Sequence, residues 1–130
     1  GLGWHSYANK MPFIRSYNEG RRMRPEALEA LLSSIKKWQR IVGSPTALDH
    51  GRGNCPLCTI FFSKQCEHCP VRESTGAVGC SYTPYASWDL HISQHGGQRS
   101  RTPGCKECLR LAKAELAFLV GLLPDKDKRQ

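Results

Sequence analysis

Residues 55–80 read CPLCTIFFSKQCEHCPVRESTGAVGC and carry five cysteines in 26 positions. The first four form two C-x-x-C pairs, Cys55 with Cys58 and Cys66 with Cys69, and Cys80 follows. Two intervening residues are the separation at which one tight turn aims both sulfurs at a single ion. The stretch therefore predicts a structural metal site, and we expect this site to decide the fold of the middle of the chain.

More cysteines are present than one tetrahedral ion needs. Because only seven residues separate the two pairs, Cys80 could replace Cys66 as the fourth ligand. Four thiolates leave no position for water, which indicates a structural rather than a catalytic ion. Zinc is the ion that we expect, since the tight C-x-x-C-x-x-C ladder of the alternative, an iron–sulfur protein, is absent. The candidate ligands, four of which would bind, are Cys55, Cys58, Cys66, Cys69 and Cys80.

A third C-x-x-C pair, Cys105 and Cys108, lies at the start of a predicted helix. Helical spacing places Cys108 in an apolar stripe, so we expect the pair to serve as small buried apolar side chains. The alternative is a second ion, which the pair would hold together with Cys80, His91 or His95. The two histidines are four residues apart and would face the same side of a helix, but we expect them to be exposed.

Two amphipathic helices are predicted, one on each side of the cysteine-rich stretch. Residues 25–42 begin with Pro25 in a first-turn position, and Gly43 follows them as a stop signal. Residues 103–123 begin after Thr102, a plausible cap, and end before a proline. A short helix over 87–94 is signalled more weakly. The first apolar stripe comprises Leu28, Leu31, Leu32, Ile35, Trp38 and Val42, and the second comprises Cys108, Leu109, Ala112, Leu116, Leu119 and Leu123.

The predicted fold is a small metal-stabilised fold of α-helices and irregular structure. The two flanking helices pack together, and a loop-rich zinc module with four cysteine ligands, over residues 50–100, connects them. This module is rich in glycine and proline and has few apolar residues. Zinc binding in small folds contributes roughly 10 to 16 kcal/mol, so we expect the metal to replace a missing core.

Length and composition predict one domain, which we place at residues 23–124, between a flexible extension over 1–22 and a charged tail over 125–130. No apolar run reaches the length of roughly 18 residues that a membrane span requires, and residues 1–20 lack a signal-peptide pattern. Seven cysteines would leave one unpaired in a secreted protein. We therefore expect a reducing cytoplasm and metal-bound thiolates rather than disulfides.

The chain carries 19 Lys and Arg against 11 Asp and Glu, a formal net charge of +8. Such an excess attracts nucleic acid through long-range, salt-sensitive electrostatics, although an ordinary solvated surface is the alternative explanation. The candidate phosphate contacts are Arg21, Arg22, Lys36, Lys37, Arg40, Arg52 and Lys64.

The chain resembles a family of small, largely uncharacterised cysteine-rich proteins of bacteriophages and prophages in the spacing of several motifs. The resemblance covers roughly residues 23–124. It is carried by the flanking helical segments and by residues 55–58, 61–62, 66–71, 75–76, Cys80, 83–85 and Trp88. It implies a zinc-finger-like fold and a phage origin, hence the cytoplasm of a bacterial host, but no established activity. Cys105 and Cys108 lie outside the pattern of that family.

The sequence thus predicts a non-catalytic zinc-binding module that binds nucleic acid through a basic surface. The first alternative is a protein-interaction module that modulates a host protein. The second is a metal-dependent nuclease built on Asp49 and His50, which would need an Asn-x-x-His ligand set that the chain lacks where it would be expected. No catalytic residue, membrane contact or small-molecule substrate is expected.

Overall fold

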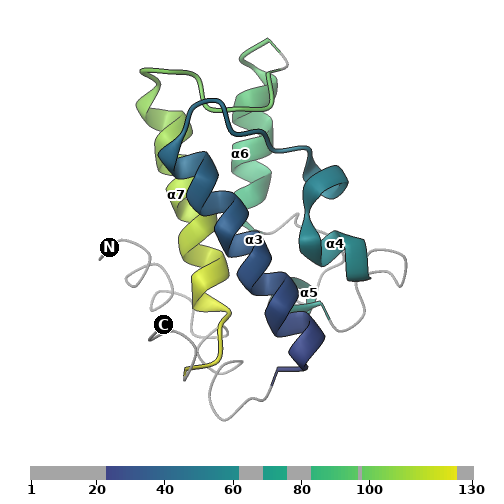
Figure 1. Ribbon diagram of the computed structural model, residues 1–130. Helices are drawn as coiled ribbons and strands as arrows, with labels where there is room; N and C mark the ends of the chain where they lie inside the picture. The colour runs from purple at the N-terminus through teal and green to yellow at the C-terminus, as the bar shows by residue number, and fades with distance from the viewer. Residues whose placement is uncertain (1–22, 62–68, 76–82, 97, 126–130) are drawn as a thin grey trace.

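The computed structural model describes residues 23–61, 69–75, 83–96 and 98–125. Within these residues the chain is helical and contains no strand. The two long helices, α3 and α7, lie side by side, α6 packs on α7, and α4 packs on α3 (Figure 1). The predicted packing of the first long helix against the last is therefore confirmed. The elements are α3 (Pro25–Gly43), the 3-10 helix η1 (Gly51–Asn54), α4 (Pro56–Phe61), α5 (Pro70–Thr75), α6 (Pro84–Ser93) and α7 (Lys106–Gly121).

Helix α3 forms where the sequence predicts it. Pro25 occupies the first turn, and Glu26 lies at the positive end of the helix dipole. At the other end Arg40 lies in the last turn, and its carbonyl accepts a 2.9 Å hydrogen bond from the Ser44 N–H. The buried face is shifted slightly from the predicted stripe and includes small residues: Ala27, Ala30, Leu31, Ser34, Ile35, Lys37, Trp38 and Ile41.

Helix α7 begins at Lys106, three residues after its predicted start. Gly104 adopts a φ of +82°, a left-handed conformation that interrupts a helix, so Thr102 and Pro103 belong to the preceding turn. Cys105 takes the capping position in place of Thr102. The predicted end at residue 123 is also too late, because α7 ends at Gly121.

The prediction of a loop-rich module between the long helices is wrong for the residues that the structure describes there, because three prolines of this stretch start helices. Pro56, Pro70 and Pro84 each open a helix, where a fixed φ and a missing N–H are favourable. In α6 the Thr83 side chain accepts a hydrogen bond from the Tyr85 N–H and so caps the helix. The short helix predicted over 87–94 is thus confirmed, but it begins at Pro84.

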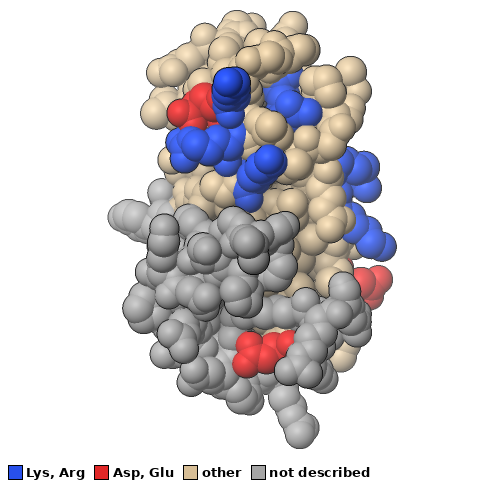
Figure 2. Space-filling view, turned by 90° about the vertical axis from the view of Figure 1, so that its left-hand side faces the viewer, with Lys and Arg blue, Asp and Glu red and all other residues tan. Residues whose placement is uncertain are grey.

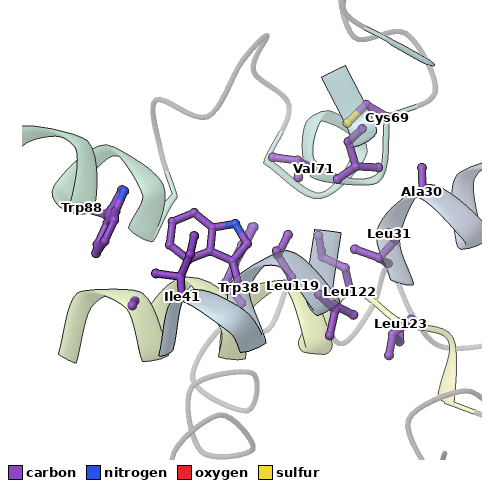
Figure 3. Close-up of a cluster of buried hydrophobic side chains, with 14 of the residues drawn as sticks. Ala30, Leu31, Trp38, Ile41, Cys69, Val71, Trp88, Leu119, Leu122 and Leu123 are labelled. Atoms are coloured by element: carbon purple, nitrogen blue, oxygen red, sulfur yellow. The ribbon is translucent and has the colours of Figure 1, made fainter. Parts of the chain in front are cut away.

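One hydrophobic cluster joins α3, α5, α6 and α7 (Figure 3). Trp38 lies near its centre, with its ring edge-on to Trp88 at a centroid distance of 5.2 Å. Cys69 and Val71 add the short helix α5 to the same cluster. This shared core shows that the middle of the chain packs on the long helices by ordinary apolar burial and does not rest on a metal alone.

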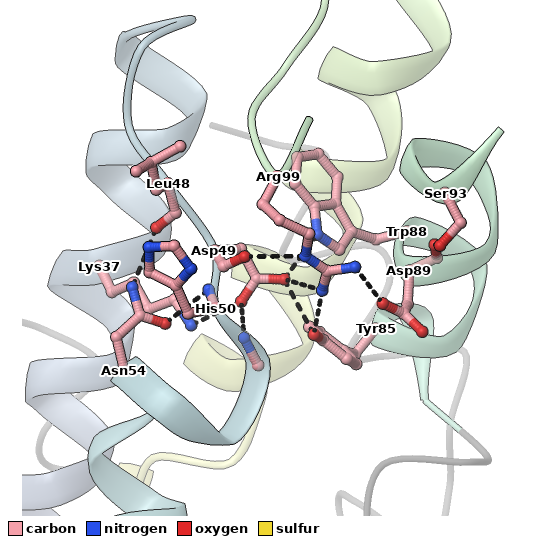
Figure 4. A network of polar contacts seen from close by, with 11 residues as sticks. Lys37, Leu48, Asp49, His50, Asn54, Tyr85, Trp88, Asp89, Ser93 and Arg99 are labelled. Atoms are coloured by element: carbon pink, nitrogen blue, oxygen red, sulfur yellow. Dashed lines mark hydrogen bonds and ion pairs between the residues drawn. The ribbon is translucent and has the colours of Figure 1, made fainter. Parts of the chain in front are cut away.

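A buried carboxylate, Asp49, connects the elements at one end of the bundle (Figure 4). Its Oδ1 accepts hydrogen bonds from Lys37 Nζ at 2.8 Å and from the Gly51 N–H at 2.9 Å. Its Oδ2 accepts from Tyr85 Oη and Trp88 Nε1, both at 2.9 Å. Asp49 is completely buried, so these donors replace the water that the charge has lost.

Arg99 completes this arrangement, which we call the Asp49 latch: Lys37, Asp49, Tyr85, Trp88 and Arg99. Its guanidinium lies 3.2 Å from Asp49 Oδ2, and its Nε donates to the Asp49 carbonyl at 3.0 Å. The Asp49 N–H donates to the Arg99 carbonyl at 2.8 Å. The latch therefore fixes the segment after α3 against both α6 and the segment before α7.

The latch holds Asp49 in its ionised form. Burial would raise the pKa of Asp49, but the hydrogen bond and charge of Lys37, with smaller contributions from Gly51 and Trp88, lower it below its ordinary value. Burial and the nearby Asp49 carboxylate raise the pKa of Tyr85, which therefore remains a neutral donor.

Glu115 on α7 is a second buried acid, but its environment has the opposite effect. Its Oε1 is buried and has no hydrogen-bond partner among the described residues. Burial first, and then the nearby thiol of Cys55 in its ionised form, raise the pKa of Glu115 well above its ordinary value. The ionised form of Glu115 therefore destabilises the folded chain.

We predict that Asp49→Asn lowers the free energy of unfolding by about 3 kcal/mol, because it leaves the buried Lys37 ammonium without its counter-ion. Urea unfolding at neutral pH measures the loss. The control is Asp89→Asn, which removes a half-exposed carboxylate and should cost less than about 1 kcal/mol. A carboxylate whose pKa is lowered by folding stabilises the folded chain above its unfolded pKa, and this stabilisation is lost as the pH falls. Below about pH 4 the difference in unfolding free energy between Asp49→Asn and the wild type should therefore shrink.

We predict that Glu115→Gln stabilises the protein by about 1 to 3 kcal/mol at about pH 8 and by much less at about pH 5. A carboxyl group whose pKa is raised by folding destabilises the folded chain only at pH values where it is ionised in the unfolded chain. This destabilisation grows as the pH rises. Thermal unfolding at the two pH values measures the effect. Glu107→Gln, on the exposed face of the same helix, is the control and should show no such pH-dependent gain; an equal gain would contradict the prediction.

Candidate metal centre

Four side chains converge where α6 ends and α7 begins. The ligand atoms of His91, His95, Cys105 and Cys108 all lie within 4.8 Å of one another. The two histidine Nε2 atoms are 3.0 Å apart, and Cys105 Sγ lies 3.5 Å from His91 Nε2 and 3.8 Å from His95 Nε2. These four residues, which we call the His/Cys cluster, lie close enough together to hold a metal ion.

Local structure places each member of the cluster. His91 is in the last turn of α6, and His95 follows one turn later, where its N–H donates to the Ile92 carbonyl at 3.0 Å. Cys105 precedes α7, and its sulfur accepts a hydrogen bond from the Cys108 N–H at 3.5 Å. Gly96, with a φ of +83°, lets the chain turn directly after the second histidine.

The ligand atoms of His91, His95 and Cys105 are spaced approximately as they would be around a tetrahedral ion. Zn–S bonds of about 2.3 Å and Zn–N bonds of about 2.0 Å require neighbouring ligand atoms to lie roughly 3.3 to 3.8 Å apart. The two Cys105–histidine distances, 3.5 and 3.8 Å, fall in this range, and the distance of 3.0 Å between the histidine nitrogens is slightly shorter. The other distances, which involve Cys108 Sγ, lie within 4.8 Å, so shifts of about 1 Å or less would bring all four atoms around one ion.

The two cysteines differ in acidity. The Cys108 N–H donates to Cys105 and, against the effect of burial, lowers the pKa of the Cys105 thiol. Burial raises the pKa of Cys108. Cys105 is therefore the first thiolate available to a metal, whereas Cys108 needs the positive charge of the ion to lose its proton.

The structure brings this group together although the sequence favoured other roles for all four residues. Cys108 is fully buried, as expected for a small apolar side chain, but its sulfur is in the cluster. The histidines, expected to be exposed, are only partly so. The signal was in the sequence: nine residues separate a histidine pair at helical spacing from a C-x-x-C pair. The metal site was nevertheless predicted elsewhere, because the cysteines of residues 55–80 are more densely clustered.

The five-cysteine site stays a prediction, because Cys66 and Cys80 lie outside the described residues. Cys55, directly before α4, interacts with Cys58. This hydrogen bond first, and then backbone N–H groups and the charge of Lys37, lower the pKa of Cys55 to about 6 despite burial. Cys69 is buried in the core. The first pair thus has the same form as the third, a cysteine at a helix start whose sulfur accepts from the N–H three residues later.

The residues predicted to contact phosphates lie in different surroundings. Lys36 and Arg40 are exposed on α3, whereas Lys37 is buried and its ammonium is paired with Asp49. Arg52 lies in η1, and Arg21, Arg22 and Lys64 lie outside the described residues. On the face of the molecule seen in Figure 2, several Lys and Arg side chains, with an acidic group among them, lie in the upper part, toward the end of the bundle where α3 ends and α7 begins.

The residues proposed for a nuclease are not arranged as a catalytic pair. Both carboxylate oxygens of Asp49 are occupied by the latch, so this side chain offers no free position to a metal ion or to water. His50 is exposed, and its backbone N–H donates to Asn54 Oδ1 at 2.8 Å. Asp49 is therefore a structural residue, and His50 belongs to the surface.

No helix among the described residues combines the length and the apolar character that a membrane crossing requires. Comparisons with protein-family models, with curated proteins and with solved structures find no match to the chain. The resemblance to cysteine-rich phage proteins accordingly stays a prediction, and the function has to be argued from the site itself.

Proposed function

We propose that this chain is a non-catalytic zinc-binding module that binds nucleic acid through its basic surface. The observation that carries the proposal is the convergence of His91, His95, Cys105 and Cys108 within 4.8 Å at the end of the bundle where basic side chains gather. The metal would fix that end of the fold, and the surrounding charge would bind phosphates.

Zinc is the ion that best fits the donor set. Two thiolates and two imidazoles form the ligand set of many structural zinc sites, and they fill all four positions of a tetrahedron. Hard cations such as Mg²⁺ and Ca²⁺ prefer oxygen donors. A closed shell leaves no position for a reactive water, which supports a structural role over catalysis.

Charge supports nucleic acid as the partner. The whole chain carries a net charge of +8. Four bound side chains, two of them thiolates, would leave a zinc centre with no net charge, so metal binding would change this excess little. Because Lys36 and Arg40 are exposed and without an ion-pair partner among the described residues, their charge is available to phosphates.

A protein partner is the second candidate. Leu48 and Leu90 are 49% and 64% exposed and provide apolar contact area for a protein partner. The two leucines lie on separate segments, and such isolated apolar residues are common on monomeric proteins. Binding to one protein that persists at high salt, without any binding to DNA or RNA, would favour this candidate.

We predict that the purified protein contains zinc and that His95→Ala and Cys105→Ser each remove about one equivalent per chain, because three remaining ligands hold the ion poorly. Elemental analysis after removal of loosely bound metal measures the content. His50→Ala, an exposed histidine outside the cluster, is the control and should retain all the zinc.

Two further results would distinguish the sites. Zinc that is retained in both cluster variants but lost in Cys55→Ser would assign the ion to the cysteine-rich stretch alone and contradict a metal at the His/Cys cluster. Zinc that is lost in part in each set of variants would indicate two separate ions.

We also predict salt-sensitive binding of DNA or RNA. Each neutralised phosphate contributes about 0.7 to 0.9 to the slope of log K against log salt concentration, so a few contacts give a slope of roughly −2 to −4. Fluorescence anisotropy with labelled single-stranded and duplex oligonucleotides over a salt series measures this slope. A complete lack of binding at low salt would overturn the nucleic-acid part of the proposed function.

A further inference from the structure

A groove of about 640 Å³ lies between α3 and the segment that follows it. Its volume is within the range of roughly 300 to 1,000 Å³ that is typical of small-molecule and nucleotide sites. The residues that line it come from α3, from the connection to η1, and from the start of α4: Ser33, Lys36, Lys37, Arg40, Ile41, Thr46, Ala47, Leu48, His50, Asn54 and Pro56.

The groove is basic. Lys36, Arg40 and His50 are exposed and line it, and no acidic residue does so in the part of the chain that the structure describes. Lys37 also lines the groove, but the Asp49 latch neutralises its ammonium from behind. The available basic groups therefore come from both walls of the groove, two from α3 and one from the segment that follows it.

The outer wall of the groove is built from its own hydrogen bonds. The Asn54 side chain donates to the Leu48 carbonyl at 3.0 Å and accepts from the His50 N–H at 2.8 Å, as Figure 4 shows. Within the same wall Gly51 adopts a φ of +57° and donates to the latched Asp49. Because the wall is held in place before a ligand arrives, little conformational entropy is lost on binding.

The groove also has an apolar part. Ala47, Leu48 and Pro56 line it beside the basic groups, and Leu48 leaves about half of its surface exposed. A ligand that combines an anionic group with a flat apolar one would match both parts. A nucleotide has this composition, since its phosphate is anionic and the faces of its base are apolar.

We propose that this groove binds one nucleotide unit of single-stranded nucleic acid, with the phosphate between Lys36, Arg40 and His50 and the base over Leu48. The inference rests on the proposed function and assigns the contact to one site. In a duplex the bases are paired and stacked, and their faces cannot reach an apolar wall without being unstacked. The groove therefore prefers single strands.

The test compares two double variants of the full chain. Lys36→Gln with Arg40→Gln removes the groove charges on α3, whereas Lys106→Gln with Lys113→Gln removes the same charge from exposed positions on α7. Labelled oligothymidylate is titrated by anisotropy over a salt series, with a duplex as competitor. Zinc content and thermal unfolding verify that each variant is folded.

The groove variant should bind oligothymidylate about tenfold more weakly and reduce the salt slope by about 1.4, the value for two contacts on a single strand. The α7 variant removes the same charge from the basic surface outside the groove, so it should also weaken binding, but only about threefold and clearly less than the groove variant. Leu48→Ser should weaken oligothymidylate binding about fivefold without changing the salt slope, because a stacked base contributes affinity without releasing counterions.

Three outcomes would overturn the proposal. Equal losses of affinity in the two double variants would show that binding depends on the overall positive charge. The proposed nucleic-acid function would then remain, but without a specific site in this groove. A duplex that competes as well as the single strand would exclude base contact in the groove. Wild-type protein that binds neither probe would remove both the groove and the nucleic-acid function.

Discussion

The ionised carboxylate of Asp49 is the constraint on which the described structure depends. A buried charge is tolerated only when hydrogen bonds and an opposite charge replace its hydration, and Asp49 obtains these from Lys37, Trp88 and Arg99, which belong to three different segments. Each of those segments has one position in which all bonds form together. The latch therefore specifies how the irregular connections lie over the helices, which apolar packing alone would leave loosely defined.

Much of the helical framework was predictable from the sequence, because α3 and α7 bury apolar residues at three- and four-residue steps. The middle was not, since Pro56, Pro70 and Pro84 carry the same local signal whether they break a helix or begin one. Glu115 and Asp49 were equally unpredictable as core residues, because a charged side chain is buried only when its tertiary surroundings permit. The side-chain partners of Asp49 are distant in sequence, and no periodic pattern encodes the burial of either acid.

The His/Cys cluster illustrates the same limit. C-x-x-C pairs are local, so sequence spacing predicts that Cys105 and Cys108 share one turn. Their meeting with His91 depends on how α6 packs on α7, which the sequence pattern does not give. The metal site was predicted in residues 55–80 because cysteines are dense there. A metal site needs only two local pairs of ligand residues that the fold brings close together. Local motifs thus indicate ligands, whereas packing decides which motifs combine.

The latch and the cluster act on one connection, the segment between His95 and Cys105. A metal would hold both ends of this segment, and its middle carries Arg99, which holds Asp49. Arg101, beside it, donates to the Ile41 carbonyl at the end of α3 at 2.7 Å. Closing a loop at its ends lowers the entropy that its interior must still lose, so a metal bound at the His/Cys cluster would favour the contact between Arg99 and Asp49. Asp49 in turn accepts a hydrogen bond from the Gly51 N–H, so Arg99 and the wall that bears His50 are connected through one buried carboxylate.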